Sequence, residues 1–184
     1  MLTLSTDIPG VFIIEPRVFR DSRGYFFESF SERDFAAKVA PVHFVQDNES
    51  MSSRGVIRGL HFQAPPFAQA KIVRVVSGRV LDVALDIRRG SPAYGRHVAV
   101  ELSGENKRMM FIPKGFAHGF SVLSETAVFQ YKCDEFYTPG AEGGISLMDG
   151  SLGIDWGIPS GEAILSEKDT RHPMFADFIS PFEY

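Results

Sequence analysis

The segment VIRGLHFQ, residues 56–63, places a cation and a titratable base three residues apart, beside a glycine. The guanidinium group of Arg58 can bind an anion, and the imidazole of His61 can take up or release a proton near neutral pH. Lys71 follows on the next apolar segment and adds a second cation. Each residue alone is also typical of an ordinary strand. Together they indicate a site that binds an anion and moves a proton.

A second histidine, His118, lies in FIPKGFAHGF, in a P-x-G-x-x-H turn that resembles the second motif of the cupin superfamily of jelly-roll barrels. In metal-binding cupins that histidine joins an H-x-H pair and a glutamate from the first motif. Here the first motif would read His61-Phe62-Gln63, so the second imidazole is missing. We therefore expect no metal ion. His118 would then be structural, or a hydrogen-bonding residue near the site with Asp82 as a candidate partner.

Three further groups each allow two interpretations. Tyr131 lies on the apolar side of its segment, where it is either a core tyrosine or part of the site. Tyr137 is either an exposed aromatic residue or a platform for a planar base. Lys168 and Asp169, in LSEKD, form either a solvated charge pair or a unit in which Asp169 orients His61.

The composition limits the class of protein. The chain has 184 residues, 44% of them hydrophobic, which is enough for one sizeable core, and we expect a single domain over residues 1–184. A formal charge of -4 gives no overall positive field to attract nucleic acid or an anionic membrane. Cys133 is the single cysteine, which fits a reducing compartment. Without a signal peptide or a long apolar run at its start, the protein is expected to be cytoplasmic, with no nucleic-acid or membrane partner.

The apolar residues recur mostly with period two, which predicts β-strands. A hairpin is predicted over residues 71–87, with Ser77-Gly78 as its turn and alternate apolar residues from Leu81 to Ile87 on one face. Further strands are expected at 11–14, 24–30, 97–102, 108–112, 119–123 and 127–133.

One helix is predicted over residues 32–39, with Ser31 as N-cap and Phe35 on the buried side. From about Ala141 the chain is rich in Gly and Pro and should return over the strands. This pattern predicts an all-β protein, a cupin-type double-sheet jelly-roll barrel with a few short helices, which can enclose a ligand cavity.

Nearly the whole chain resembles the dTDP-4-dehydrorhamnose 3,5-epimerase family. The motifs that carry the resemblance, in order, are EPRVFRDSRGYFFESF, FVQDN, VIRGLHFQ, AKIVRVVSGRVLDVALDIRRGSP, LSGENKRMMFIPKGFAHGF, YKCDEFYTP and LSEKD. The resemblance implies a homodimer, no metal and no dissociable cofactor, a dTDP-4-keto-6-deoxy sugar substrate, and a place in dTDP-L-rhamnose synthesis for cell-surface polysaccharide.

The same resemblance assigns roles to individual residues. It implies that His61 is the proton acceptor, that Asp169 is paired with it, and that Tyr131 is the proton donor. Tyr137 matches the residue that stacks on the thymine ring, and Lys71 is our candidate for stabilising an enolate oxygen. The other substrate-binding positions fall on Arg23, Glu28, Gln46, Asp47, Asn48, Arg58, His118, Glu142 and Lys168.

Two segments depart from the family's usual pattern. The loop FQAPPFAQA ends in Ala70 where the family usually has glycine, and SLMDG replaces a segment that more often contains tryptophan. Both leave the exact nucleotide sugar open. The alternatives are an epimerase that inverts one carbon or acts on another 4-keto sugar, a metal-dependent cupin enzyme, and a non-catalytic sugar-binding cupin.

Overall fold

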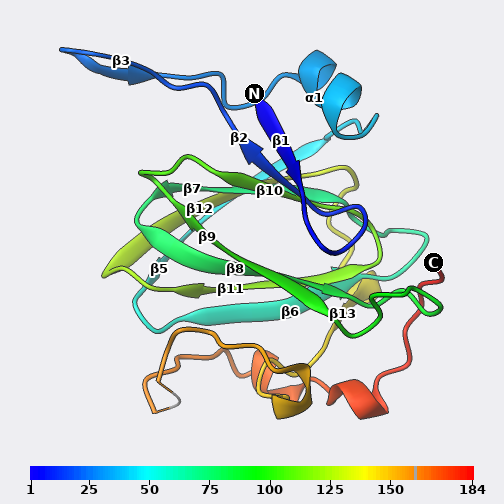
Figure 1. The fold of residues 1–184 in the computed structure, drawn as a ribbon. Coiled ribbons are helices and arrows are strands. Elements are labelled where there is room, and N and C mark those ends of the chain that lie inside the picture. The colour runs from blue at the N-terminus through cyan, green and yellow to red at the C-terminus, as the bar shows by residue number, and fades with distance from the viewer. Residues whose placement is uncertain (160) are drawn as a thin grey trace.

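Two antiparallel sheets, stacked face to face, form the body of the protein (Figure 1). The structure is a computed structural model that describes residues 1–159 and 161–184. In spatial order, the first sheet consists of β1 (Leu2–Ser5), β2 (Phe12–Glu15), β10 (Met109–Ile112), β7 (Lys71–Ser77), β12 (Thr126–Cys133) and β5 (Gln46–Ser53). The second consists of β13 (Glu142–Gly144), β6 (Ile57–Gln63), β11 (Phe116–Val122), β8 (Arg79–Asp86) and β9 (His97–Ser103). The all-β, double-sheet prediction is confirmed.

The main core lies between the sheets because both contribute apolar side chains to it. Val73 and Phe129 come from the first sheet, and Val80 and Phe120 come from the second. Phe120 and Phe129 stack with ring centroids 4.2 Å apart. Burying such side chains contributes about 1.5–3 kcal/mol each, so this layer is what holds the sheets together around the cavity described below.

The expected hairpin over residues 71–87 is wrong. β7 pairs with β10 and β12 in the first sheet, whereas β8 pairs with β11 and β9 in the second. The Ser77-Gly78 turn therefore carries the chain from one sheet to the other. The period-two pattern did identify the faces correctly, because Val83, Leu85 and Ile87 lie together on the outer side of the second sheet. Sequence alternation fixes which residues share a face, but it does not fix which strand is the neighbour.

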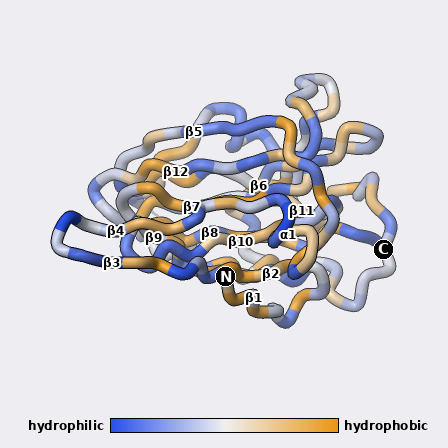
Figure 2. Tube along the Cα trace, turned by 90° about the horizontal axis from the view of Figure 1, so that it is seen from above, coloured by the Kyte–Doolittle hydropathy of each residue, from blue (hydrophilic) through white to orange (hydrophobic). Residues whose placement is uncertain are grey.

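The other predicted elements match with small shifts. The helix α1 spans Glu32–Lys38, Ser31 caps it by accepting a hydrogen bond from Asp34 N at 3.3 Å, and Phe35 is buried. The expected strand at 24–30 is shorter, because β4 (Gly24–Phe26) pairs with β3 (Phe19–Asp21) in a separate two-stranded arm. β5 was not predicted because its sequence, QDNESMSS, is largely polar, as Figure 2 shows.

The segment after β13 covers the outer face of the second sheet, as expected (Figure 1). It contains the short 3-10 helices η2 (Gly150–Leu152), η3 (Asp169–Arg171) and η4 (Phe175–Asp177). Another short 3-10 helix, η1 (Pro139–Ala141), comes just before β13. Trp156 anchors the segment after β13: its carbonyl accepts a 2.6 Å hydrogen bond from Ser121 Oγ, and its ring is buried. The residues that follow are thereby held against the sheet that carries β6.

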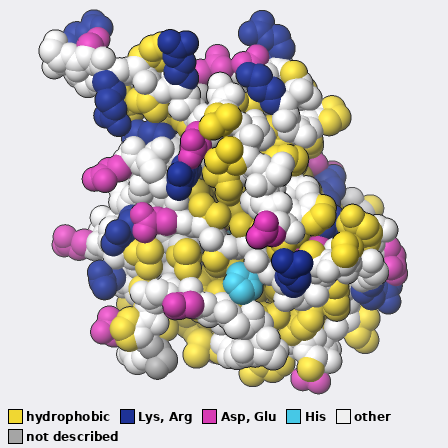
Figure 3. Space-filling model, viewed as in Figure 1, with side chains coloured by type: hydrophobic (Ala, Val, Ile, Leu, Met, Phe, Trp, Pro, Cys, Tyr) yellow, Lys and Arg dark blue, Asp and Glu magenta, His cyan; other side chains and the backbone are white. Residues whose placement is uncertain are grey.

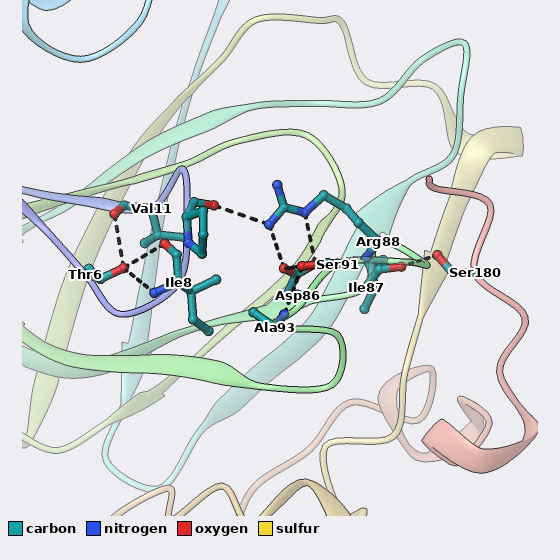
Figure 4. Close-up of polar contacts among 10 residues, drawn as sticks. Thr6, Ile8, Val11, Asp86, Ile87, Arg88, Ser91, Ala93 and Ser180 are labelled. Carbon is teal, nitrogen blue, oxygen red and sulfur yellow. Dashed lines mark hydrogen bonds and ion pairs between the residues drawn. The ribbon is translucent and has the colours of Figure 1, made fainter. Parts of the chain in front are cut away.

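A polar cluster fixes the end of this segment (Figure 4). The fully buried carboxylate of Asp86 accepts hydrogen bonds from Arg88 at 2.9 and 2.6 Å, and Arg88 also donates to the Pro9 carbonyl at 3.2 Å. Ser180, in the C-terminal tail, donates to the carbonyl of Ile87. The N-terminal loop, the end of β8 and the tail are joined at one point, so the covering segment is tied down at both of its ends.

Candidate active site

A cavity of about 560 Å³ opens between the two sheets. One wall comes from β6 and β11 and the opposite wall from β5, β7 and β12, while residues of the C-terminal segment line its rim. The predicted site residues that line it are Asn48, Arg58, His61, Lys71, His118, Tyr131, Lys168 and Asp169. Residues far apart in the sequence are thus brought to one concave site, which is the usual form of a small-molecule site.

A bulge in β6 explains how Arg58 and His61 both face this cavity. In a regular strand, residues three apart point to opposite sides. Here His118 pairs with His61 while Phe120 pairs with Arg58, so β6 has one extra residue over this stretch. Gly59 sits at the bulge with a φ of 141°, and a Cβ on it would lie 2.6 Å from the Cα of the neighbouring strand's glycine. Glycine is therefore required there.

His61 and Asp169 form a hydrogen-bonded pair. Nε2 of His61 lies 2.6 Å from Oδ1 of Asp169, whose side chain is only 4% exposed. Because an ionised carboxylate can only accept, Nε2 carries the proton and Nδ1 is the nitrogen left for a substrate. Burial lowers the pKa of His61 below 6.5, and the hydrogen bond and charge of Asp169 offset part of that effect. The imidazole is therefore neutral, and able to act as a base, at pH 7.

The C-terminal segment places Asp169 beside His61 by pairing with the start of β6. Ile164 forms a parallel bridge with Val56, and its carbonyl accepts a 3.1 Å hydrogen bond from the amide of Ile57. Asp169 then begins η3, where its amide donates to Ser166 Oγ at 3.1 Å. The solvated-pair interpretation of Asp169 is wrong, because its carboxylate is buried on the imidazole.

Tyr131 and Lys71 lie on the opposite wall. Their strands, β12 and β7, are adjacent, and the Lys71 ammonium lies 5.6 Å from the centre of the Tyr131 ring. Burial raises the pKa of Tyr131 above its ordinary value of 10.0 and lowers that of Lys71 below 10.5. The Tyr131 ring packs against the main core, and the residue also lines the cavity. Both interpretations of Tyr131 therefore describe part of what is seen: its ring packs on the core, and its protonated phenol belongs to the cavity wall.

His118 has its own carboxylate, as proposed from the sequence. Its Nε2 lies 3.0 and 3.1 Å from the two oxygens of Asp82, which is fully buried. His118 and His61 are register partners on adjacent strands, so two imidazole–carboxylate pairs stand on the same wall. Arg58, beside them, is steadied by Ser52, whose Oγ accepts from both Nε and Nη2 at 3.1 and 3.0 Å. Ser52 lies in none of the motifs identified in the sequence.

A second group of polar residues lies at the mouth. Glu142 Oε2 is 2.5 Å from Lys168 Nζ and accepts a 2.9 Å hydrogen bond from the exposed Tyr137 hydroxyl. Burial alone would raise the pKa of Glu142, but the bonds from Lys168 and Tyr137 outweigh it and lower that pKa. Gln46 accepts from the amide of Tyr137 at 3.0 Å, and its own amide donates to Asn48. These contacts join β5, the loop after β12 and the C-terminal segment around the opening.

Three predicted substrate-binding residues lie away from this cavity. Asp47 points to the outer face of β5 because strand residues alternate, and there it pairs with Lys132 at 2.8 Å. Arg23 lies at the tip of the arm, bonded to Asp21, and Glu28 lies near the base of the arm. A single chain therefore does not bring Arg23 or Glu28 to the His61 cavity.

The expectation of no catalytic metal rested on Gln63, and this residue has a structural role. Its amide donates to the carbonyls of Phe67 and Phe136 at 2.7 and 3.2 Å, and its oxygen accepts from the amide of Thr138. It therefore ties the mouth loops together and is not directed at a metal. No sequence motif marks His172, whose Nε2 lies 3.8 Å from Asp169 Oδ1. One ligand atom each from His61, Asp169 and His172 lies within 4.8 Å of the other two.

Cys133 can be set aside as a nucleophile or ligand. It is buried, and burial raises the pKa of its thiol to about 11, so it stays neutral. In the described part of the chain, no helix is both long and apolar enough to cross a membrane.

Comparison with known proteins gives a consistent result. A family model described as dTDP-4-dehydrorhamnose 3,5-epimerase matches residues 5–177. The enzyme of that name from Shigella flexneri is 51% identical over 178 residues, which covers 96% of this chain and 97% of that protein.

Solved structures agree in fold. The dTDP-6-deoxy-D-glucose-3,5-epimerase of Legionella pneumophila, solved with dTDP-4-keto-L-rhamnose, is 45% identical with a TM-score of 0.95, covering 100% of this chain and 98% of its own. A 3'-monoepimerase from Streptomyces bikiniensis, solved with dTDP-quinovose, is 33% identical with a TM-score of 0.85. The match covers 93% of this chain and 86% of the monoepimerase chain.

Proposed function

Because this chain belongs to the dTDP-4-dehydrorhamnose 3,5-epimerase family, we propose that it inverts C3 and C5 of dTDP-4-dehydro-6-deoxy-D-glucose to give dTDP-4-dehydro-L-rhamnose. It would do so as one domain, in the cytoplasm, for dTDP-L-rhamnose synthesis. The observation that carries the proposal is that a neutral imidazole and a protonated phenol line one cavity from opposite sheets. Inversion at a carbon needs a base on one face of the ring and an acid on the other.

The substrate's own ketone explains why no cofactor is needed. The C4 carbonyl acidifies the hydrogens on C3 and C5, because either carbanion delocalises onto the C4 oxygen as an enolate. Lys71 supplies a positive charge on the Tyr131 side of the cavity, where it would stabilise that oxygen. A well-placed donor of this kind is worth about 2.7–4 kcal/mol.

One wall of the cavity then removes a proton from the substrate, and the opposite wall returns one. Nδ1 of His61 takes the proton from carbon, and Asp169 stabilises the imidazolium that forms. The Tyr131 hydroxyl gives a proton to the opposite face of the same carbon, which leaves a phenolate. Exchange with solvent returns both groups to their starting states, and the cycle repeats at the second carbon. Each group would contribute roughly 10²–10⁴-fold.

Binding of the dTDP group is assigned to the remaining cations and the mouth. Arg58 lies on the wall beside His61 and is held by Ser52, where it can neutralise a phosphate. His118, Asn48 and Lys168 line the same cavity. Tyr137, more than half exposed at the mouth, has the ring surface needed to stack on thymine.

We also propose a homodimer in which the arm of each chain reaches the partner's site. The arm exposes Phe19, Tyr25 and Phe26, and basic side chains gather along it (Figure 3). Arg23 and Glu28 match substrate-binding positions but lie away from their own cavity. A second copy is the occupant that would both cover these rings and bring Arg23 to a diphosphate.

Mixing two inactive variants tests this arrangement. Arg23→Ala and His61→Asn chains, unfolded together and refolded, form mixed dimers with one intact site if Arg23 acts across the interface. Random pairing then restores about a quarter of wild-type activity. If the mixture stays inactive while each variant binds dTDP as a dimer, Arg23 does not act across the interface.

A single-carbon epimerase is the second candidate, favoured by the likeness to the 3'-monoepimerase. Incubating the purified protein with dTDP-4-dehydro-6-deoxyglucose in heavy water, with a reductase to trap the product, separates the two. Deuterium at both C3 and C5 supports the double epimerase. Deuterium at one carbon alone overturns it in favour of the second candidate.

A further inference from the structure

A buried imidazole that the proposed reaction does not use lies beside the His61–Asp169 pair. The side chain of His172 is 13% exposed, and its Nε2 atom is buried without a hydrogen-bond partner among the described residues. Its ring lies flat against the strand β13 at Gly144, where a Cβ would come within 2.4 Å of Nε2. The backbone thus leaves space for this ring, although an unpaired buried nitrogen is costly.

The unpaired nitrogen lies close to two other potential metal ligands. Oδ1 of Asp169 lies 2.6 Å from His61 Nε2 and 3.8 Å from His172 Nε2, and the two rings meet edge to face with centroids 5.6 Å apart. Ligand atoms around tetrahedral zinc are about 3.3 Å apart, given bonds of about 2.0–2.1 Å. Shifts of less than about 1 Å would therefore bring all three atoms onto one ion.

We propose that His61, Asp169 and His172 form an inhibitory site for a transition metal of the Zn²⁺ class. Two imidazoles and one carboxylate are a donor set that such ions prefer, and water would complete the coordination. This site differs from the cupin metal motif, whose second imidazole is missing here, because His172 comes from a different part of the chain.

The charges around the site bear on its affinity. Burial lowers the pKa of both His61 and His172, so both are neutral near pH 7, as metal ligation requires. Lys71 and Lys168 oppose a cation, but Lys168 is already paired with Glu142. The carboxylate of Asp169 lies beside both imidazoles, where its negative charge favours a bound cation.

Metal binding would switch off the base by fixing its tautomer. The ion takes the place of the proton that His61 Nε2 shares with Asp169, and the ring takes up one proton from solvent on Nδ1, so its proton count does not change. The neutral ring then carries its single proton on Nδ1, the nitrogen that faces the substrate. An N–H there cannot accept a proton from carbon. This inhibition rests on the proposed epimerase activity, whereas the metal site itself does not.

The test begins with binding alone. Metal-free protein is titrated with Zn²⁺ by calorimetry and with Co²⁺ by visible absorption. We expect one equivalent of either ion to bind wild-type protein, with the absorption of a tetrahedral cobalt site. Since even outer partners of a metal site are worth 10–100-fold in affinity, His172→Ala should weaken binding at least about tenfold. His43→Ala is the matched control, because His43 is exposed and bonded to Glu32, and it should bind like wild type.

Activity and anomalous scattering complete the test. Without metal, His172→Ala and the bulkier His172→Gln should exchange substrate hydrogen at the wild-type rate, since His172 does not line the cavity. Zn²⁺ should inhibit wild type, EDTA should reverse this, and both variants should resist. The proposal is overturned if wild type and the variants bind Zn²⁺ equally well. It is also overturned if the anomalous density at the zinc absorption edge lies away from the three ligand atoms. If the protein is inactive on the keto sugar, the titration and the zinc-edge density still decide the metal site.

Discussion

Replacing Asp169 tests the central pair of the site most informatively. Asp169→Ala removes the 2.6 Å bond from a buried, charged acceptor to His61. Bonds of this kind contribute about 1.5–3 kcal/mol. Because the imidazolium forms as the proton leaves carbon, the loss falls on the transition state, and kcat should drop roughly 10–150-fold. KM should change little, since Asp169 holds His61 more than it holds the sugar.

Asp169→Asn should be at least as slow as the alanine variant. Its amide NH₂ can donate to His61 Nε2, which moves the ring proton to Nδ1 and blocks the base. Wrong-tautomer effects of this kind reach about 10⁴-fold in serine proteases.

The pH profile gives an independent readout. His61 is active when neutral, so activity falls as the pH drops through its pKa. Asp169 raises that pKa against the lowering effect of burial. Without the carboxylate the pKa falls further, so the acidic limb of kcat/KM should move to lower pH. The assay is hydrogen exchange at C3 and C5 followed by NMR.

Asp177→Asn, an exposed carboxylate, is the control and should behave as wild type. Unchanged kcat in Asp169→Asn, or an acidic limb that moves to higher pH, would refute the role of Asp169 in orienting and stabilising His61.

Other changes have equally defined outcomes. Tyr131→Phe should retain hydrogen exchange but lose inversion, because abstraction and return use opposite walls; equal loss of both, measured by NMR, contradicts this. Lys71→Met should lower kcat about 10²–10³-fold, and a variant with wild-type kcat removes Lys71 from enolate stabilisation. In wild type the basic limb of the pH–activity profile should appear below pH 10.5, because burial lowers the pKa of Lys71. Gly59→Ala should cost about 1–3 kcal/mol from strain, seen as a lower melting temperature, whereas Gly140→Ala, with open space around its Cβ position, should not; equal melting points would show that the bulge tolerates a side chain.

The sequence predicted the elements better than their pairing. Period-two alternation correctly grouped Leu81, Val83, Leu85 and Ile87 on one face of β8 and the residue that follows it, because alternation is a property of each strand by itself. The assignment of β7 and β8 to different sheets depends on which faces fit together across the core, and no local pattern records that. β5 was missed for a related reason. One of its faces lines a polar cavity and the other meets solvent, so it lacks the apolar signal of a strand.

The site was predicted mainly through the resemblance, and spacing alone would have misled. Arg58 and His61 reach the same face only because of the bulge at Gly59, which a strict strand pattern excludes. Asp47 shows the reverse case, since it lies within a matched motif but points outward. His172 and Ser52 lie outside all the motifs identified in the sequence. Their positions depend on packing of the C-terminal segment and on cross-strand contact, which become visible only in three dimensions.

The most direct test of the account is hydrogen exchange in His61→Asn. The variant keeps a side chain of similar polarity at the same place on β6, so the cavity and Arg58 should still hold the nucleotide. With dTDP-4-dehydro-6-deoxyglucose in heavy water, we predict that exchange at C3 and C5 falls roughly 10²–10⁴-fold, while the affinity for dTDP stays near that of wild type. Exchange at the wild-type rate would contradict the claim that His61 is the base.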